Sequence, residues 1–389
     1  MSSRQGLTAA FVVVAVLAAG GLLLAGASRD APQRAAAGDD AAGELRVSRD
    51  GWKTDFARHS VPLSQFISGG PPRDGIAPID DPKFVAPAAA AGWLDPSEPV
   101  IVVESGASAR AYPHQILIWH EIVNDQLDGD PIAVTYCPLC NSALVFDRRL
   151  DGRTLRFGTT GNLRRSDLVM WDDATESWWQ QLTGEAVVGE LTGERLRALP
   201  AETLSFADFR ARHPRGEVLS RDTGHDRDYG ANPYEGYDTA DEQPFLLDGE
   251  ADRRLPPKER VAAAFVGDEV AVVPFPRLAR KRVVNAEVGG RPLVFLFKPG
   301  VRSALDAGAI NDSKDVGTAA AFERTLDGRE LELRADGDGF VDREGGSRFD
   351  ITGRAVSGPL EGRRLPQVRH DQQFWFALAA FVPDARILD

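Results

Sequence analysis

Cysteine and methionine are scarce in this chain of 389 residues, which contains two of each. Both cysteines belong to one C-P-L-C motif, as Cys137 and Cys140, and Met170 is the only methionine apart from the initiator. Positive charge is also in deficit, since the formal net charge is −13 at pH 7. This charge argues against nucleic acid or an anionic membrane surface as the main partner, and a solubilising acidic surface explains it.

The amino-terminal segment predicts export. An uncharged apolar run extends from Leu7 to Ala27 after Arg4, long enough for a signal peptide or a membrane anchor. No cysteine follows this run, which excludes lipoprotein processing. We therefore expect residues 1–28 to carry the bulk of the chain out of the cytoplasm, as a secreted or membrane-anchored protein. Residues 29–48 predict a disordered tether, and residues 49–99 predict a segment that wraps the first domain.

The chain contains an internal duplication. Two stretches recur 161 residues later and a third recurs 169 residues later, so loop insertions change the spacing while the order is kept. Two copies are too few for a solenoid and predict two similar domains packed as a pseudo-dimer. The matching pairs are Asn124-x4-Gly129-x-Pro131 with Asn285-x4-Gly290-x-Pro292, Ser142-Ala143-Leu144 with Ser303-Ala304-Leu305, and Thr183-Gly184 with Thr352-Gly353.

Short alternating stretches predict a mainly β (α+β) fold with short helices. Asp151-Gly152 is a strong two-residue turn signal and predicts a hairpin between residues 143–148 and 154–158. We expect the first repeat domain over 100–224, a connection over 225–261 and the second repeat domain over 262–389. Further expected strands are 99–104, 132–136, 167–172 and 186–190, and the expected helices are 204–212 and 372–381.

The second copy keeps the scaffold around the C-P-L-C motif but has lost its reactive side chains. Lys298 and Val301 stand opposite the two cysteines, and Lys281 stands opposite His120. The residues opposite Met170 are near Gly339-Phe340, so the thioether is lost as well. Thiolate, imidazole and thioether together suit soft ions, above all copper(I), and zinc is the alternative. We therefore predict a metal site with the ligands His120, Cys137, Cys140 and Met170. His114, which maps onto Phe275, is a reserve ligand.

Two other interpretations of the cysteine pair stay open. Cys137 and Cys140 could be the catalytic pair of a metal-free dithiol oxidoreductase with a separate redox partner. The residues after Cys140 alternate like a strand, so the helix that lowers the thiol pKa in thioredoxins is missing. Alternatively, the cysteines form a structural disulfide in a non-enzymatic module that binds a small molecule. A loop this short would gain little stability from such a bond.

Polar and aromatic residues around the same strands predict a pocket lined by Arg165, Asp167, Glu176 and Trp179. Trp178 and Trp179 are adjacent, and neighbouring side chains of a strand point to opposite faces. We therefore expect one of the two indoles to line a pocket or a domain interface.

Several motifs together resemble the domain-of-unknown-function family DUF3179. The resemblance extends from about Trp52 to the carboxyl terminus and implies an exported bacterial or archaeal protein with a cysteine pair, without implying a mechanism. The family pattern includes the position of His120 and not that of His114, which favours His120 as the ligand. The motifs are G-G-P-P-R-D-G-I (69–76), W-H-E-I-V-N-D (119–125), T-Y-C-P-L-C (135–140), S-D-L-V-M-W-D (166–172), T-E-S-W-W-Q (175–180) and H-D-R-D-Y-G-A-N-P-Y (225–234).

Overall fold

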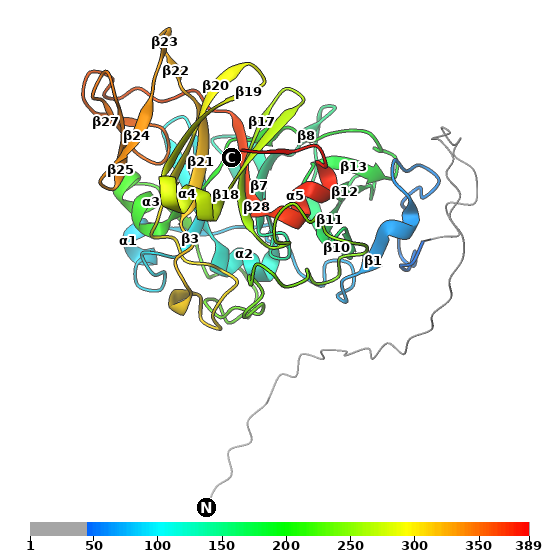
Figure 1. Cartoon of the computed structure of the whole chain (residues 1–389). Coiled ribbons are helices and arrows are strands. Elements are labelled where there is room, and N and C mark those ends of the chain that lie inside the picture. The colour runs from blue at the N-terminus through cyan, green and yellow to red at the C-terminus, as the bar shows by residue number, and fades with distance from the viewer. Residues whose placement is uncertain (1–44, 389) are drawn as a thin grey trace, which may run out of the picture. The chain divides into compact units, whose positions relative to one another are not determined.

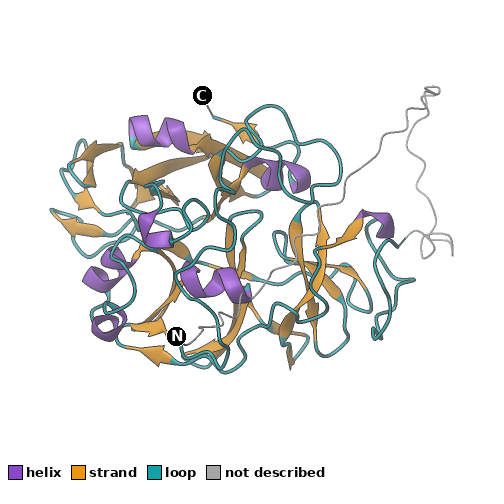
Figure 2. Cartoon of the chain, turned by 90° about the horizontal axis from the view of Figure 1, so that it is seen from below, coloured by secondary structure: helices purple, strands orange, loops and turns teal. Residues whose placement is uncertain are grey.

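The computed structural model describes residues 45–388, which belong to one compact unit built mainly from β-strands (Figure 1). Helices are few and short, as Figure 2 shows. The predicted signal or anchor segment (1–28) and most of the predicted tether (29–48) lie outside the described residues. Within 45–388 no helix combines the length and the apolar character that a membrane span requires.

The first copy contains three sheets, one small hairpin and two helices of seven residues, α2 (His114–His120) and α3 (Phe206–Arg212). A four-residue helix, α1 (Pro87–Ala90), precedes them. The first sheet has the order β15 (Glu202–Ser205), β3 (Pro99–Ser105), β4 (Ser108–Pro113), β16 (Glu217–Leu219), β2 (Phe84–Val85). The second has the order β14 (Ala198–Leu199), β7 (Ser142–Asp147), β6 (Asp130–Cys137), β5 (Ile122–Leu127). The third has the order β1 (Phe66–Ser68), β10 (Phe157–Arg164), β11 (Asp167–Asp172), β12 (Trp178–Gln180), β13 (Glu185–Val188), and the hairpin is β8 (Arg149–Leu150) with β9 (Arg153–Thr154).

The second copy repeats this arrangement with α4 (Phe275–Lys281) and α5 (Trp375–Phe381). Its first sheet has the order β28 (Arg369–Phe374), β17 (Arg260–Val266), β18 (Glu269–Pro274), β29 (Arg386–Ile387). Its second has the order β19 (Val283–Val288), β20 (Arg291–Lys298), β21 (Thr318–Glu323). Its third has the order β24 (Leu333–Asp336), β25 (Gly339–Asp342), β26 (Arg348–Phe349), β27 (Ala355–Ser357), and its hairpin is β22 (Thr325–Leu326) with β23 (Arg329–Glu330).

The prediction of a mainly β, internally duplicated fold is confirmed, because the strands of each copy pair in the same order. Even the unusual pairing is shared: β16 runs parallel to β4, and β29 runs parallel to β18, within otherwise antiparallel sheets. The repeated asparagine explains part of the sequence match. Asn124 bonds the backbone N–H and C=O of Phe157 at 2.9 and 2.8 Å, and Asn285 bonds those of Leu333 at 3.4 and 2.9 Å. Each asparagine therefore ties the second sheet of its copy to the third.

The two copies pack reciprocally. Strand β28 of the second copy lies against β7 of the first, and β15 of the first lies against β21 of the second. Such mutual contacts are those of an isologous dimer, here contained in a single chain. Core residues of both copies, such as Leu144 and Leu305, belong to one continuous cluster. The exact domain boundaries given above therefore stay a prediction within one compact unit.

The hairpin that follows the repeated asparagine contact differs between the copies. Strands β10 and β11 have eight and six residues, whereas β24 and β25 have four each. Asp172 ends β11 and Asp342 ends β25. Asp172 pairs with Phe157 and Asp342 pairs with Leu333, so the two hairpins have the same register at this end. The first copy therefore extends its hairpin at the turn, and Asp167 lies in this extension.

Trp178 and Trp179 are both fully buried, because the third sheet of the first copy is covered on both faces. Trp178 packs against Phe56 and Phe66 of the amino-terminal segment, with ring centroids 5.2 Å apart in each case. Trp179 faces the opposite side and belongs to the core that contains the cysteines. Both indoles therefore pack into covered faces of the sheet, and that of Trp179 lies in a core to which both copies contribute.

Candidate functional site

The C-P-L-C motif forms the tight connection between β6 and β7. Cys137 is the last residue of β6 and pairs with Ser142 at the start of β7. The turn is closed by a hydrogen bond from the Asn141 N–H to the Pro138 carbonyl at 3.1 Å, and Asn141 adopts a positive φ of 51°. Asparagine tolerates this left-handed conformation better than most residues. The turn folds both thiols inward, and Cys137 and Cys140 are free and buried.

Asp167 joins the two cysteines. The ligand atoms of Cys137, Cys140 and Asp167 all lie within 4.8 Å of one another, and all three residues are buried. The Cys140 thiol lies 3.3 Å from Asp167 Oδ1 and 3.4 Å from the Ser166 carbonyl. Among residues 45–388 this is the one group of three or more His, Cys, Asp or Glu side chains with that geometry.

The extended β10–β11 hairpin positions the Asp167 carboxylate. Its turn residues Arg165 and Ser166 both have positive φ values, 56° and 62°. Asp167 Oδ2 accepts hydrogen bonds from Gln180 Nε2 at 2.5 Å and from the Leu182 N–H at 3.0 Å. These two donors fix the orientation of the carboxylate and leave Oδ1 directed at the thiol. Such supporting contacts are typical of carboxylates that bind metal ions.

Burial dominates the electrostatics of the group. It raises the pKa of Cys137, and it raises that of Cys140 well above the ordinary thiol value. Burial also raises the pKa of Asp167 to about 6, although hydrogen bonds from Gln180 and Leu182 oppose the shift. The thiols are therefore protonated at neutral pH. A nucleophilic cysteine needs the opposite shift, towards the thiolate.

Glu121 is a second buried carboxylate near the group, and the sequence analysis missed it. It is 7 % exposed, and its carbonyl accepts the N–H of Tyr136, the residue before Cys137, at 2.8 Å. Burial first, and then the charge of Asp167, raise the pKa of Glu121 to about 8. Its counterpart is Arg282, which has nearly the same φ (63° against 58°) and the same backbone bond. The loss of an acidic residue between the copies was a signal available in the sequence.

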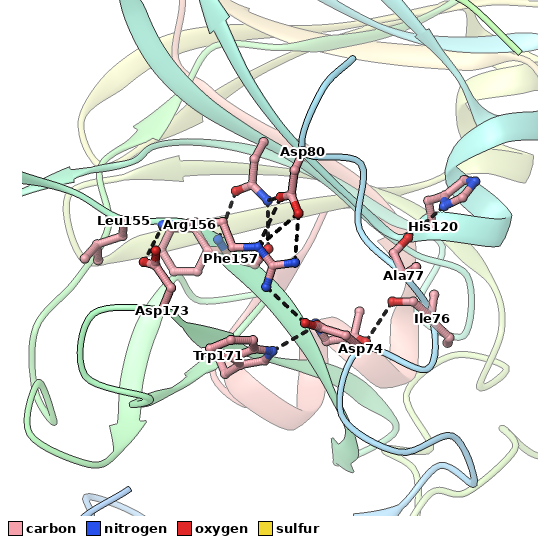
Figure 3. A network of polar contacts seen from close by, with 12 residues as sticks. Asp74, Ile76, Ala77, Asp80, His120, Leu155, Arg156, Phe157, Trp171 and Asp173 are labelled. Carbon is pink, nitrogen blue, oxygen red and sulfur yellow. Dashed lines mark hydrogen bonds and ion pairs between the residues drawn. The ribbon is translucent and has the colours of Figure 1, made fainter. Parts of the chain in front are cut away.

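His120 makes other contacts. Its Nδ1 lies 2.7 Å from the carbonyl of Ala77 and must donate to it, so Nε2 accepts the Tyr229 hydroxyl at 2.6 Å. Figure 3 shows the ring directed at the segment that carries Ala77, Asp74 and Asp80. Burial lowers the His120 pKa to about 4, so the ring is neutral. Its nitrogens do not belong to the group formed by the cysteines and Asp167.

The other two predicted or reserve ligands lie in packed surroundings. Met170 is fully buried in the same hydrophobic core as both cysteines, in the strand that begins with Asp167. His114 packs against the ring of Tyr136, with centroids 4.4 Å apart, and its Nε2 has no partner among the described residues. Burial lowers the His114 pKa to about 3.

Of the four predicted pocket residues, the structure places only Asp167 in the ligand group. Arg165 donates to the Asp248 carbonyl at 3.2 Å and anchors the connection between the copies. Glu176 accepts the Lys53 N–H at 2.7 Å and pairs with Arg73 at 3.2 Å, so it anchors the amino-terminal segment. Trp179 donates its indole N–H to Asp172 at 2.9 Å inside the core.

The connection between the copies covers the cysteine turn. The Tyr237 hydroxyl donates to the Leu139 carbonyl at 3.1 Å, and the Phe245 carbonyl accepts the Ser166 hydroxyl at 2.6 Å. Burial raises the pKa of Tyr234 well above the ordinary phenol value, and Glu121 and Cys137 are the first neighbouring groups that add to this shift. Residues 234–248 thus shield the site from water.

Asp74 and Asp80 fix the segment that carries Ala77, the residue that His120 contacts. Arg156 bridges the two carboxylates at 3.0 and 2.9 Å, and the Trp171 indole donates to Asp74 at 3.0 Å (Figure 3). Asn124 also donates to Asp80 at 2.8 Å. The motif residues of this region therefore serve to fix the loop that orients His120.

Comparison with known proteins gives a family and no activity. No curated protein and no solved structure matched the chain. The family model described as "Protein of unknown function (DUF3179)" matches residues 73–385, which include the cysteine turn, the extended hairpin and both copies. The chain therefore belongs to the DUF3179 family.

Proposed function

We propose that Cys137, Cys140 and Asp167 bind a thiophilic metal ion in the first copy. The observation that carries the proposal is the convergence of two sulfurs and one carboxylate oxygen within 4.8 Å of one another in a buried site. The second copy has Lys298 and Val301 in place of the cysteines and a hairpin too short to supply the aspartate. Every member of the group is thus specific to one copy, while the frame around it is common to both.

The charge of the site supports a cation. Two thiols with raised pKa values and two carboxylates with raised pKa values lie within one protected region. Buried anions are strongly destabilising unless a positive charge compensates them. A metal ion supplies that charge and displaces the thiol protons, so binding releases protons.

The ligand set favours zinc over copper. Zinc accepts thiolate and carboxylate ligands together, usually four in a tetrahedron. Copper(I), the ion that the sequence favoured, prefers sulfur ligands, so the carboxylate of Asp167 suits it less well than it suits zinc. Redox chemistry at the bound ion itself would require copper, because zinc has no redox chemistry of its own.

Metal analysis of the full-length protein tests the proposal. The protein is reduced, loaded separately with zinc and with copper(I), and freed of unbound metal. We expect about one tightly bound ion per chain, and a loss of at least about 100-fold in affinity in Cys140→Ser, since a ligand matters more than the supporting contacts worth 10- to 100-fold. Met170→Leu is the matched control: it leaves zinc binding unchanged and weakens copper(I) only if the thioether is a ligand. Equal metal in wild type and Cys140→Ser would exclude the ligand role.

A metal-free dithiol is the second candidate. The sulfurs of Cys137 and Cys140 lie within 4.8 Å of each other, and Asp167 Oδ1 is placed to accept the Cys140 proton. In this case the two thiols lose two protons and two electrons to form a disulfide, and a disulfide of a redox partner is reduced to two thiols. A reversible Cys137–Cys140 disulfide in a protein that binds no metal would favour it.

Export stays part of the proposal. The support is the apolar run at Leu7–Ala27, which would place the site outside the cytoplasm. A reporter fused after Asp389 should be active only outside the cytoplasm, and cytoplasmic activity would contradict export.

A further inference from the structure

A small cavity lies beside the cysteine turn, where the two copies meet. Its volume is about 20 Å³. It is lined by residues that correspond to each other in the two copies, Asn141 with Arg302 and Ala143 with Ala304, each pair 161 residues apart. A point that contacts both members of matched pairs lies near the two-fold axis of an isologous arrangement. The cavity therefore lies at the interface between the two copies, and none of Cys137, Cys140 and Asp167 lines it.

One of the lining residues, His114, has a buried ring nitrogen without a hydrogen-bond partner among the described residues. The residue is 5 % exposed, and the nitrogen is Nε2. An unsatisfied buried polar group costs about 1–3 kcal/mol. The second copy has Phe275 at the matching position and avoids this cost. The first copy keeps a histidine where an apolar ring would pack, which points to a partner for its Nε2.

The charge of the lining is positive. Two guanidinium groups, from Arg260 and Arg302, line the cavity, and none of its lining residues is acidic. Asp238 compensates Arg260 through an ion pair of 2.9 Å. Arg302 has no ion pair within 4.0 Å among residues 45–388; its Nη1 donates to the Ser313 carbonyl, and its buried Nε lacks a partner. One positive charge is thus left over beside a histidine that can donate a hydrogen bond.

We propose that this cavity binds a single monatomic anion of the chloride class, held by His114, Asn141 and Arg302. The volume admits one atom-sized species and excludes phosphate or a carboxylate, because a water alone needs about 10–15 Å³ by the same measure. The positive charge distinguishes an anion from a water. This site is independent of the proposed metal site, since none of Cys137, Cys140 and Asp167 lines the cavity.

The anion would fix the back of the cysteine turn. The Asn141 side chain already accepts the Tyr136 hydroxyl at 3.2 Å, and the Cys140 carbonyl accepts the Phe374 N–H of the second copy at 2.9 Å. An ion shared by Asn141 and Arg302 adds a second link between the copies at this place. The second copy would thereby position the cysteine turn of the first.

Bromide, which scatters anomalously, is the probe. The full-length protein is crystallised in bromide, and bromide affinity is measured by the rise of the unfolding midpoint at constant ionic strength, with methanesulfonate as the replacing anion. We expect one anomalous peak in the cavity and an apparent dissociation constant at least about tenfold higher in Arg302→Gln, since a hydrogen bond to a charged group is worth about 1.5–3 kcal/mol. His114→Phe, the residue of the second copy, should weaken binding similarly while the fold is kept.

Matched controls separate the possible outcomes. Arg291→Gln removes a charge from an exposed position of the same copy and should leave bromide binding unchanged. Cys140→Ser should also leave it unchanged, which makes this test independent of the metal proposal. A water in the cavity, or a midpoint that rises equally in wild type and Arg302→Gln, would overturn the proposal.

Discussion

The two copies of this chain share their frame down to single hydrogen bonds and differ in the groups that can react. Arg148 donates to the Leu155 carbonyl at 3.0 Å, and Arg324 donates to that of Leu331 at the same distance. Ser177 accepts the Leu191 N–H at 3.0 Å, as Ser347 accepts that of Leu360. Residues retained in both copies are therefore explained by folding alone.

The differences gather at one place. Cys137, Cys140, Asp167 and Glu121 have no chemical equivalents in the second copy, where Arg282 replaces Glu121 and no residue replaces Asp167. The second copy thus serves as an internal control, because it distinguishes residues required for folding from residues specific to the metal site. The predictions below test this separation.

The largest effect is expected for Asp167→Asn. The amide keeps the shape and can still meet Gln180 and Leu182, but it loses the negative charge that faces Cys140. We expect metal affinity to fall by about 100-fold, measured by competition with a chelator. Asp342→Asn in the second copy is the control and should change metal affinity little. An unchanged affinity in Asp167→Asn would remove the carboxylate from the ligand set.

Glu121→Gln should change the pH dependence of stability in the metal-free protein. Burial raises the Glu121 pKa from 4.5 to about 8, so the folded state binds more protons than the unfolded state between these values. Stability is therefore lost as pH rises through this range. The Asp167 carboxyl, with a pKa raised to about 6, contributes in the same direction, whereas the Cys137 thiol, whose pKa is raised from 9.0, contributes only at higher pH.

Glutamine cannot ionise, so the variant should lose less stability between about pH 5 and pH 8. The difference from wild type at pH 8 should be on the order of a few kcal/mol. Urea unfolding at several pH values measures it. Parallel pH profiles for the two proteins would show that Glu121 is not held in the protonated form.

Asn124→Ala and Asn285→Ala compare one frame contact in both copies. Asn124 is buried and also bonds Asp80, whereas Asn285 is exposed and bonds only Leu333. We expect losses of about 1–3 kcal/mol for Asn124→Ala and about 1 kcal/mol or less for Asn285→Ala, measured by chemical unfolding. Neither should change the metal stoichiometry. A loss of metal in Asn285→Ala would contradict a purely structural role for the motif.

The smallest effect is expected for a graft of the cysteines into the second copy. The double variant Lys298→Cys, Val301→Cys restores both thiols but not the aspartate of the extended hairpin. We expect no second metal ion per chain by elemental analysis. A second tightly bound ion would show that the two thiols suffice and that Asp167 is not required.

The duplication was predictable because frame residues recur at nearly constant spacing. Asn124 and Asn285 make the same contacts with the backbone in their two copies. Their constant spacing was therefore a reliable sign that the copies share one fold. The turn at Asp151-Gly152 and the strand at 167–172 were predicted for similar reasons, since turn chemistry and alternation are local signals. The arms of that hairpin are only Arg149–Leu150 and Arg153–Thr154, because most of the predicted arm 143–148 pairs with β6 instead. Both cysteines followed from their loss in the second copy.

The third member of the site was harder to predict. Asp167 was placed in the pocket but not among the ligands, because its distance from Cys140 depends on how far a hairpin of another sheet extends. His120 was chosen because it is lost in the second copy, yet its nitrogens bond Ala77 and Tyr229, which come from loops far away in the sequence. A residue that is absent from the second copy is identified as specific to the first. Its absence does not show which of these specific residues contact one another.

X-ray absorption spectroscopy of the zinc-loaded, full-length protein tests the central claim most directly. The account predicts two sulfur scatterers at about 2.3 Å and at least one oxygen at about 2.0–2.2 Å, with the sulfur signal lost in the Cys137→Ser, Cys140→Ser double variant. A first shell of nitrogen and oxygen alone, or a sulfur shell that survives in the double variant, would contradict it.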